Sequence, residues 1–227
     1  EAGAEVRGVT CDVADPVSLG RAAEAAFAAF GKVHVLCNNA GVAAGSGIDH
    51  IALDTWRWVL DVNLMGVLPG IAAFLPHIRA HGEGGHIVNT ASMAGLASGM
   101  GFSPYTVSKY AVVALSEGLA AELKPHRIGV SLLCPGFVQS RINDAGRNRP
   151  GRYGAAVAPD PASPGGLFAA EIARRLQAGL DPAKVAERVL AAIRADEFYV
   201  FTHPELRDGV EARFGGIMAA LDKAAQG

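Results

Sequence analysis

The sequence alternates short apolar runs with longer stretches that carry apolar residues at helical spacing. Short strands separated by helices of roughly 10 to 20 residues are typical of βαβ units, whose strands lie parallel in one sheet. The expected strands cover residues 5–13, 33–41, 85–92, 128–136 and 197–203. The expected helices cover residues 15–31, 53–82, 105–125, 166–179, 181–195 and 204–225. The pattern predicts an α/β fold with a doubly wound parallel sheet.

Capping and breaking residues support these boundaries. Asp15 is placed to cap a helix that has Pro16 at its first position, and Gly31 is placed to end it. Candidate breaks inside expected helices are Pro69, Pro76, Gly215 and Gly216. Residues 141–166 are rich in Gly, Pro, Arg and Asp and predict a mobile loop. No domain boundary is evident, so we expect residues 1–227 to form a single domain.

Composition excludes several classes of protein. The chain has 227 residues, of which 50% are hydrophobic, with a formal charge of -2 and a pI of about 6.4, so nothing favours nucleic acid or an anionic membrane. We find no uninterrupted apolar run of roughly 18 residues and no signal peptide at the start, and expect a cytoplasmic protein. Cys11, Cys37 and Cys134 each lie in or beside an apolar run, which predicts buried, reduced thiols.

Polar or glycine-containing turns follow the first four expected strands. In open parallel sheets, ligands bind beyond the carboxyl ends of the strands, so these turns are expected at one edge. The turns contain Asp12 and Val13, then residues 38–41, then Ala91 and Ser92, then Pro135 and Gly136. Tyr105 and Lys109 open the helix after the third strand, and their spacing puts both on one helix face. The sequence therefore predicts a site at this edge.

These motifs resemble the classical short-chain dehydrogenase/reductase family. The N-N-A-G turn of that family is matched at residues 38–41, and its helical asparagine is matched by Asn63 in "DVNLMG". Its serine, thirteen residues before the tyrosine of Y-x-x-x-K, is matched by Ser92, Tyr105 and Lys109. The Pro-Gly turn is matched at residues 135–136. The resemblance covers residues 1 to about 140 closely and implies an oxidoreductase that uses NAD or NADP.

The resemblance implies a catalytic tetrad of Asn63, Ser92, Tyr105 and Lys109. Interconversion of a secondary alcohol and a ketone or aldehyde needs a group that gives and takes a proton. A free tyrosine has a pKa of about 10, which a nearby ammonium lowers, so Lys109 is expected to make Tyr105 a usable acid and base. Ser92 can donate a hydrogen bond to the substrate oxygen. Asn63 resembles the family residue that holds a water behind the lysine.

Further residues resemble the family's cofactor contacts. Asp12 and Val13 resemble the adenine-contacting pair, although Asp12 is equally placed to cap the next segment. Lys109 resembles the residue that holds the nicotinamide ribose, and Tyr105 lies beside it. The remaining expected contacts are Asn39, Ala40, Gly41, Pro135, Gly136, Val138 and Ser140. Ser140 stands where the family often has threonine. None of the seven histidines has metal-ligand spacing, and we expect no metal site.

The family's first strand, its T-G-x-x-x-G-x-G turn, a helix and a second strand have no counterpart in the sequence. We therefore expect a fragment, in which the strand at 5–13 lacks a neighbour and the strand at 33–41 is an exposed apolar edge. The residue that selects NAD or NADP is outside it, so the sequence leaves that choice open. Two readings follow. One is an active oxidoreductase, and the other is a truncated, non-catalytic scaffold or partner protein.

The substrate and the oligomer are less constrained. Residues 141–195 follow the Pro-Gly turn, where the family builds its substrate lid. Phe168, Ile172 and Leu176 form one helical stripe that either covers an apolar alcohol or ketone or packs on the core. Arg141, Arg147, Arg149 and Arg152 either meet a carboxylated substrate or belong to a solvated loop. The resemblance implies a homodimer or homotetramer formed through the helices at 53–82 and 105–125.

Overall fold

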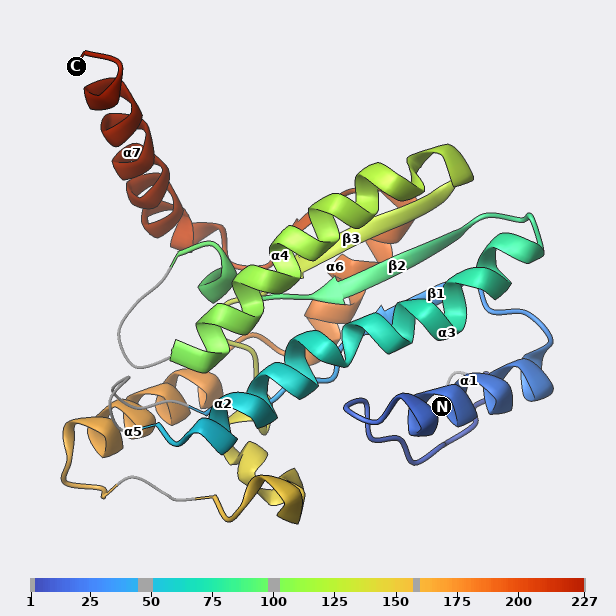
Figure 1. Cartoon of the computed structure of the whole chain (residues 1–227), viewed down its shortest axis with the longest axis horizontal. Coiled ribbons are helices and arrows are strands. Elements are labelled where there is room, and N and C mark those ends of the chain that lie inside the picture. The colour runs from blue at the N-terminus through green and yellow to red at the C-terminus, as the bar shows by residue number, and fades with distance from the viewer. Residues whose placement is uncertain (1–2, 45–50, 98–102, 157–159, 227) are drawn as a thin grey trace.

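The computed structural model describes residues 3–44, 51–97, 103–156 and 160–226. Within these residues, four strands form one parallel sheet in the order β1-β2-β3-β4 (Figure 1). The strands are β1 (Val35–Asn38), β2 (Gly85–Thr90), β3 (Ile128–Cys134) and β4 (Tyr199–Phe201). Because every pairing is parallel, the carboxyl ends of all four strands meet at one edge. The α/β fold with a parallel sheet is as the sequence predicts.

Helices connect and cover the strands. The helices are α1 (Pro16–Phe30), α2 (Leu53–Leu60), α3 (Val67–Ala80), α4 (Ser103–Leu123), α5 (Pro164–Gln177), α6 (Pro182–Ala195) and α7 (Arg207–Ala224). Shorter 3-10 turns are η3 (Met93–Gly95), η4 (Lys124–His126), η5 (Ile142–Asn148), η6 (Gly151–Tyr153) and η7 (Pro204–Leu206). Helices α3 and α4 pack on β1, β2 and β3, whereas α6 packs on β3 and β4. Helix α7 points away from the sheet (Figure 1).

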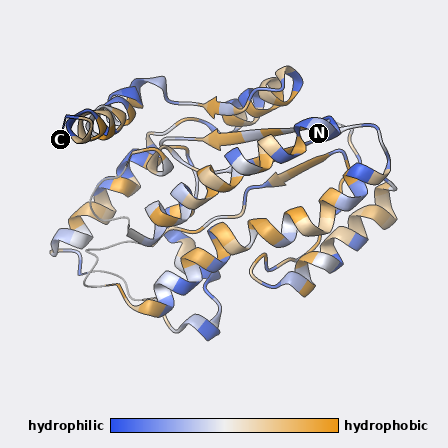
Figure 2. Ribbon diagram, turned by 45° about the horizontal axis from the view of Figure 1, so that its top comes forward, coloured by the Kyte–Doolittle hydropathy of each residue, from blue (hydrophilic) through white to orange (hydrophobic). Residues whose placement is uncertain are grey.

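Apolar side chains fill both interfaces between sheet and helices. Ile87 and Val130 pack with Ile78 of α3 and Leu123 of α4. Figure 2 shows the strands as predominantly hydrophobic ribbons between mixed helices. Asp15 caps α1 through Val17 N–H, and Gly31 ends it with a φ of 72°, as the sequence predicts. Burial of apolar area of this kind is the main force that fixes the sheet edge as a rigid platform.

Several predicted elements differ from the structure. Residues 5–13, all of them described, form no strand, because no neighbouring strand is there to bond with them. The expected helix at 53–82 breaks at a π-helical turn, η2 (Asp61–Met65), while Pro69 and Pro76 lie inside α3. Helix α7 continues through the two glycines, and the expected loop at 141–166 contains η5 and η6. Element boundaries thus follow pairing and packing more than local breakers.

The strand β1 lies at the edge of the sheet and is partly exposed. It is covered on one face only, by contacts of Leu36, while Val35 is 42% exposed. Cys37 is exposed, so the prediction that all three thiols are buried is wrong for it; Cys11 is half-buried and Cys134 is buried. The predicted edge position of this strand is confirmed. Side chains alternate between the two faces of a strand, so Val35 and Cys37 lie on the face opposite Leu36, while the missing neighbour leaves backbone groups of β1 unpaired.

One segment is long and apolar enough to cross a membrane by length and composition. It is Leu53–Ala80, with a mean hydropathy of 1.7, and 39% of its most apolar window is buried. Two features favour a core helix instead. The π-helical turn interrupts it, Ile78 packs against the sheet, and Trp58 packs with Ala145 and Tyr153 of the segment after β3. Core helices of α/β proteins commonly have this composition because their contact face is apolar.

Candidate active site

A cavity of about 860 Å³ opens at the carboxyl edge of the sheet. Its wall is built by the turns after β1, β2 and β3 and by the first turns of α4. Helices α5 and α6 supply further apolar wall, including Leu176 and Val185. Ser92, Tyr105 and Lys109 all line this cavity, although they come from two different elements. The parallel topology therefore brings most of the predicted catalytic residues to one place.

Asn63 lies just behind this wall, in the π-helical turn η2. Its side chain is only 1% exposed, and its amide is fully engaged. Oδ1 accepts from Val42 N–H at 2.8 Å, while Nδ2 donates to Val42 O at 2.9 Å and to Ser108 Oγ at 3.0 Å. The wide turn is what aims the side chain inward, a common use of π-helical turns at functional sites. Asn63 thus fixes the turn after β1 against helix α4.

Lys109 enters the cavity from α4 and is 3% exposed. Nζ donates to Thr90 O at 2.8 Å, which anchors the ammonium to the end of β2. A Cβ placed on Gly41 would lie 3.6 Å from Nζ and 3.6 Å from Asn63 Oδ1, so only a small residue leaves this face open. Burial lowers the pKa of Lys109 from 10.5 to about 8. The lysine is a cation held where water is scarce.

Tyr105 stands one helical turn before Lys109, with its ring centroid 5.6 Å from Nζ. Burial raises the pKa of Tyr105 above 10, and a hydrogen bond with Ser92 acts in the opposite direction. The sequence predicted a pKa lowered by Lys109, whereas here the burial of the phenolate is the largest effect and the lowering effect comes from Ser92. Ser92 Oγ also accepts from Ala94 N–H at 3.1 Å and donates to Pro135 O at 3.4 Å. The Ser92 hydroxyl is thus placed between Tyr105 and the turn after β3.

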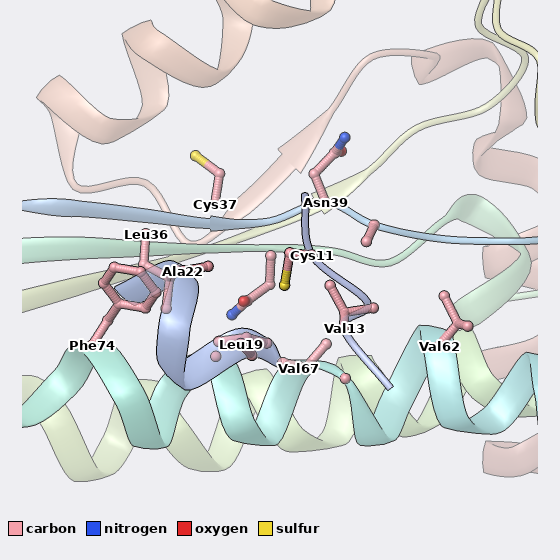
Figure 3. A pocket seen from close by; sticks show the side chains of 14 residues that line it. Cys11, Val13, Leu19, Ala22, Leu36, Cys37, Asn39, Val62, Val67 and Phe74 are labelled. Atoms are coloured by element: carbon pink, nitrogen blue, oxygen red, sulfur yellow. The ribbon is translucent and has the colours of Figure 1, made fainter. Parts of the chain in front are cut away.

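The predicted cofactor residues divide between two cavities. Gly41, Pro135, Gly136, Val138 and Ser140 line the large one. Val13 and Ala40 line a smaller cavity of about 180 Å³ between α1, β1 and α3, drawn in Figure 3. Asn39 lines both cavities and accepts a hydrogen bond from Thr90 Oγ1 at 3.0 Å. The two cavities therefore share a wall formed by the end of β1 and the turn after it.

Asp12 has a different environment from the other predicted contacts. Oδ1 accepts from Ala14 N–H at 3.0 Å, so the side chain caps the turn before α1. Oδ2 accepts from Arg152 at 2.8 Å, an ion pair that joins η6 to the N-terminal segment. The capping role that the sequence left open is thus present. A ligand at this carboxylate would have to share it with Arg152.

The segment after β3 closes the outer side of the large cavity. Arg141 and Arg147 line it, but Arg141 is paired with Asp144 at 2.6 Å and Arg147 donates to Asp144 O at 2.7 Å. Ile172 and Leu176 of the predicted stripe also line the cavity. Asp144 and nearby backbone carbonyls thus hold both guanidinium groups, whereas the apolar side chains face the open space.

Sequence reasoning missed four contacts of this site. Val42, Thr90 and Ser108 act through backbone or hydroxyl groups beside the tetrad. His203 follows β4 and binds the turn after β3, with its Nδ1 accepting from Gly136 N–H at 3.1 Å. The signal for His203 was available, because "TH" ends the last expected strand at the same sheet edge.

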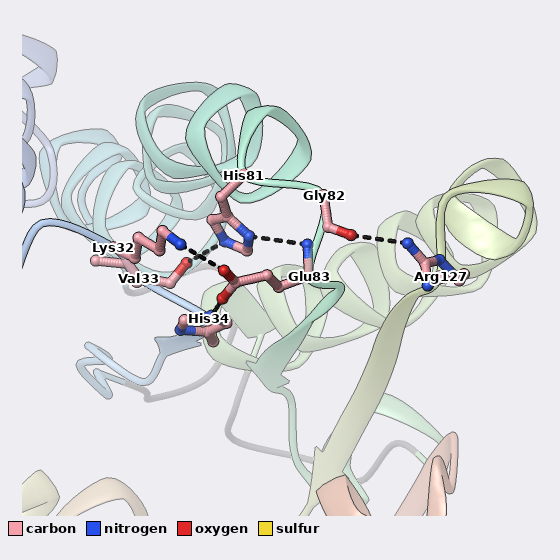
Figure 4. Close-up of polar contacts among 7 residues, drawn as sticks. All are labelled: Lys32, Val33, His34, His81, Gly82, Glu83 and Arg127. Atoms are coloured by element: carbon pink, nitrogen blue, oxygen red, sulfur yellow. Dashed lines mark hydrogen bonds and ion pairs between the residues drawn. The ribbon is translucent and has the colours of Figure 1, made fainter.

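A second polar cluster lies at the opposite, amino end of the strands (Figure 4). His34, His81 and Glu83 bring one ligand-type atom each within 4.8 Å of one another, a grouping that sequence spacing did not reveal. Both ring nitrogens of His81 are already engaged, with Val33 O and Glu83 N–H. Hydrogen bonds from Lys32 and His34 lower the pKa of Glu83 to about 2. These contacts form an ion-pair cluster that joins two turns. The ammonium of Lys32 supplies the positive charge that a metal ion would supply in a metal site.

Known proteins resemble this chain in sequence and in fold. A family model described as short chain dehydrogenase matches residues 1–150. The C alpha-dehydrogenase of Sphingobium sp. strain SYK-6 is 33% identical over 221 residues, which are 96% of this chain and 71% of that protein. The 3-alpha-(or 20-beta)-hydroxysteroid dehydrogenase of Mycobacterium tuberculosis is 40% identical over 138 residues, 61% of this chain and 53% of that protein.

A solved structure extends the likeness to three dimensions. It is a short chain dehydrogenase/reductase from Burkholderia phymatum in complex with NAD. The alignment has 40% sequence identity and a TM-score of 0.91, and it covers 96% of this chain and 78% of that one. The likeness in three dimensions therefore extends over nearly the whole chain.

Proposed function

Because the chain belongs to the short chain dehydrogenase family, we propose that it interconverts a secondary alcohol and the corresponding ketone with NAD or NADP. The observation that carries the proposal is the convergence of Ser92, Tyr105 and Lys109 on one cavity, with Asn63 behind it. An acid–base group, a hydrogen-bond donor and a buried cation together suit proton transfer at a carbonyl oxygen.

The residues present fit a nicotinamide cofactor. Lys109 spends one donor on Thr90 O and has two left for hydroxyl groups beside Gly41, where a larger side chain would fill the space. The turn after β3 supplies backbone groups along the same cavity. When bound, NAD or NADP accepts a hydride from the alcohol carbon or supplies one to the carbonyl carbon. We propose Asn39, Ala40, Val13 and Asp12 for the adenosine end, and Pro135, Gly136, Val138 and Ser140 for the nicotinamide end.

Tyr105 is proposed as the general acid and base. In alcohol oxidation its phenolate oxygen takes the hydroxyl proton, and in ketone reduction its hydroxyl gives that proton to the developing alkoxide. Ser92 Oγ donates a hydrogen bond to the same substrate oxygen. We propose that the ammonium of Lys109, which lies 5.6 Å from the ring centroid of Tyr105, favours the phenolate, while burial opposes it. Asn63 keeps the turn after β1 in place beside the lysine through its bonds to Val42.

We propose a neutral, apolar substrate. Ile172 and Leu176 face the open space, and the guanidinium groups of Arg141 and Arg147 are already hydrogen-bonded to Asp144 and to backbone carbonyls. A carboxylated substrate would need an unpaired cation at that position. The Mycobacterium relative, named for hydroxysteroids, is consistent with a bulky apolar alcohol. A cavity of about 860 Å³ has room for such a molecule beside a cofactor.

The test compares two tyrosines on the same helix. Tyr105→Phe removes the proposed acid and base, and we expect oxidation of apolar secondary alcohols to fall by about 10² to 10⁴-fold while NAD(H) or NADP(H) still binds. Tyr110→Phe makes the same change at a residue that contacts Arg213 outside the cavity, and we expect unchanged turnover. Full turnover by the Tyr105→Phe protein contradicts the proposal. A chain that binds neither cofactor would instead support the scaffold reading.

A further inference from the structure

His203 clamps the turn that follows β3. The residue comes from the end of β4, next to the turn because the two strands are paired. Its Nδ1 accepts a hydrogen bond from Gly136 N–H at 3.1 Å, and its Nε2 lies 3.0 Å from Phe137 O. Thr202 Oγ1 is 2.7 Å from the same Nδ1. One imidazole thus binds two consecutive residues of the cavity wall.

The chemistry of the partners fixes the tautomer of this ring. A backbone N–H only donates, so Nδ1 must be unprotonated to accept from Gly136. A backbone carbonyl only accepts, so Nε2 must carry the hydrogen that it shares with Phe137. His203 is therefore a neutral imidazole with the hydrogen on Nε2. No lysine or arginine offers this combination of one acceptor and one donor.

Packing and backbone bonds hold the same turn from two sides. A Cβ on Gly136 would lie 2.7 Å from His203 Cγ and 2.9 Å from Leu206 Cδ1, so the ring sits directly on the glycine. On the other side, Leu180 N–H donates to Phe137 O at 2.9 Å and Gln139 N–H donates to Leu180 O at 2.9 Å. Phe137 O is thus shared between His203 and the segment that joins α5 to α6.

The turn that His203 binds is also hydrogen-bonded to Ser92, the residue proposed to contact the substrate oxygen. Pro135 O, adjacent to Gly136, accepts from Met93 N–H at 2.9 Å and from Ser92 Oγ at 3.4 Å. A shift of Gly136 would move this carbonyl and with it the hydroxyl that we propose for the substrate oxygen. A displacement of about 1 Å at such a site can lower a rate by about 10²-fold.

We propose that His203 is a positioning residue that sets the turn at Pro135–Val138 and thereby the fit of the nicotinamide end of the cofactor. This inference rests on the proposed function, since it assigns the turn to that end of the cofactor. His203 acts through Gly136, Phe137 and Pro135. It exchanges no proton with the substrate.

The first experiment removes the hydrogen-bonding groups of His203 while keeping an aromatic ring. His203→Phe keeps a ring against Gly136 but removes both hydrogen bonds, and we expect the KM for cofactor to rise about 10-fold, with a smaller fall in kcat. His203→Asn returns an acceptor near the place of Nδ1 and is expected to restore part of that loss. His126→Phe, at an exposed histidine of η4, is the matched control and is expected to leave both constants unchanged. Cofactor KM equal to wild type in His203→Phe overturns the inference.

The second experiment tests the contact with Gly136. Gly136→Ala alone is expected to raise the cofactor KM, because its methyl group meets the imidazole. His203→Ala clears that space. In this background, Gly136→Ala is expected to raise the cofactor KM by a factor at least 3-fold smaller than it does alone. An equal rise in cofactor KM on Gly136→Ala in both backgrounds would mean that the His203 ring does not position the turn.

A measurement without cofactor separates this inference from the proposed function. The amide of Gly136 is expected to exchange its hydrogen at least 10-fold faster in His203→Phe than in wild type, because its acceptor is gone. If wild type binds cofactor and oxidises alcohols but the exchange rate and KM do not change, the inference fails and the proposed function stands. If the exchange rate changes but wild type has no dehydrogenase activity, the clamp stands and its assignment to a cofactor fails.

Discussion

The side chain of Asn63 and the backbone of Val42 exchange two hydrogen bonds across 21 residues of sequence, in the manner of two paired strands. Both groups of Val42 are satisfied by one amide, which is 1% exposed. The same amide donates to Ser108 on α4. One buried side chain thus joins the turn after β1, the π-helical turn and the helix that carries Tyr105.

Replacement of Asn63 should affect stability as well as activity. Asn63→Ala leaves the N–H and C=O of Val42 without partners in a buried place, and we expect a loss of about 2–4 kcal/mol in the free energy of unfolding. Urea denaturation measures this directly. Asn148→Ala, at an exposed asparagine of η5, is the matched control and should change stability by less than about 0.5 kcal/mol. A loss at Asn63 no larger than that control would contradict the assignment.

Lys109 should show opposite effects on activity and stability. Burial lowers its pKa to about 8, so the folded chain takes up this proton less readily than the unfolded chain. Folding stability therefore falls as pH drops from about 10.5 to about 8, and the full cost applies at neutral pH. Lys109→Met removes that cost. We expect turnover to be lost while the melting temperature at neutral pH stays equal or rises, as calorimetry can measure.

The matched control for this prediction is Lys184→Met at an exposed lysine of α6. It should leave both turnover and melting temperature unchanged. A large fall in the melting temperature of Lys109→Met would show that the bond to Thr90 O outweighs the cost of burial.

His86 should make stability depend on pH in the acidic range. It is buried, and its Nε2 bonds Ser131 Oγ at 2.8 Å, while Ser131 in turn donates to Glu197 O. Burial lowers the pKa of His86 below 6.5, more than the opposing attraction of Asp196. Unfolded chains bind this proton below about pH 6.5 and the folded chain resists it, so stability falls as pH drops through that range.

The measurement is the free energy of unfolding in urea at about pH 7.5 and about pH 5.5 for wild type and His86→Gln. We expect a smaller difference between the two pH values in the variant. His126→Gln, at an exposed histidine, should keep the wild-type difference. An unchanged difference in His86→Gln would assign the pH dependence to other groups.

Two helical glycines should respond in opposite ways to alanine. A Cβ on Gly70 of α3 would lie 2.5 Å from Asn38 Oδ1 and disturb the Asn38–Asn89 hydrogen bond between β1 and β2. We expect Gly70→Ala to cost about 1–3 kcal/mol in the free energy of unfolding. Gly20 of α1 has no atom within 4 Å of that position, so Gly20→Ala should stabilise by about 0.5–1 kcal/mol. Thermal unfolding of both variants measures these two changes in stability.

Much of this architecture could be read from local patterns. The parallel sheet, the capped helix at α1 and the shared edge for the turns after the strands all follow from periodicity and from turn residues. The Y-x-x-x-K spacing alone puts Tyr105 and Lys109 on one helix face, because residues four apart are neighbours on a helix surface. Their roles as acid, base and cation stay predictions until the variants are measured.

What the sequence determined by itself is the set of elements and the residues at their ends, because caps, breakers and apolar periods act over a few neighbouring residues. Only the tertiary structure decided which distant groups meet: Arg152 with Asp12, and His203 with Gly136. It also decided that residues 5–13 form no strand and that burial governs the pKa of Tyr105. Strand pairing, burial and long-range hydrogen bonds depend on what lies opposite a residue in space, which no local pattern encodes.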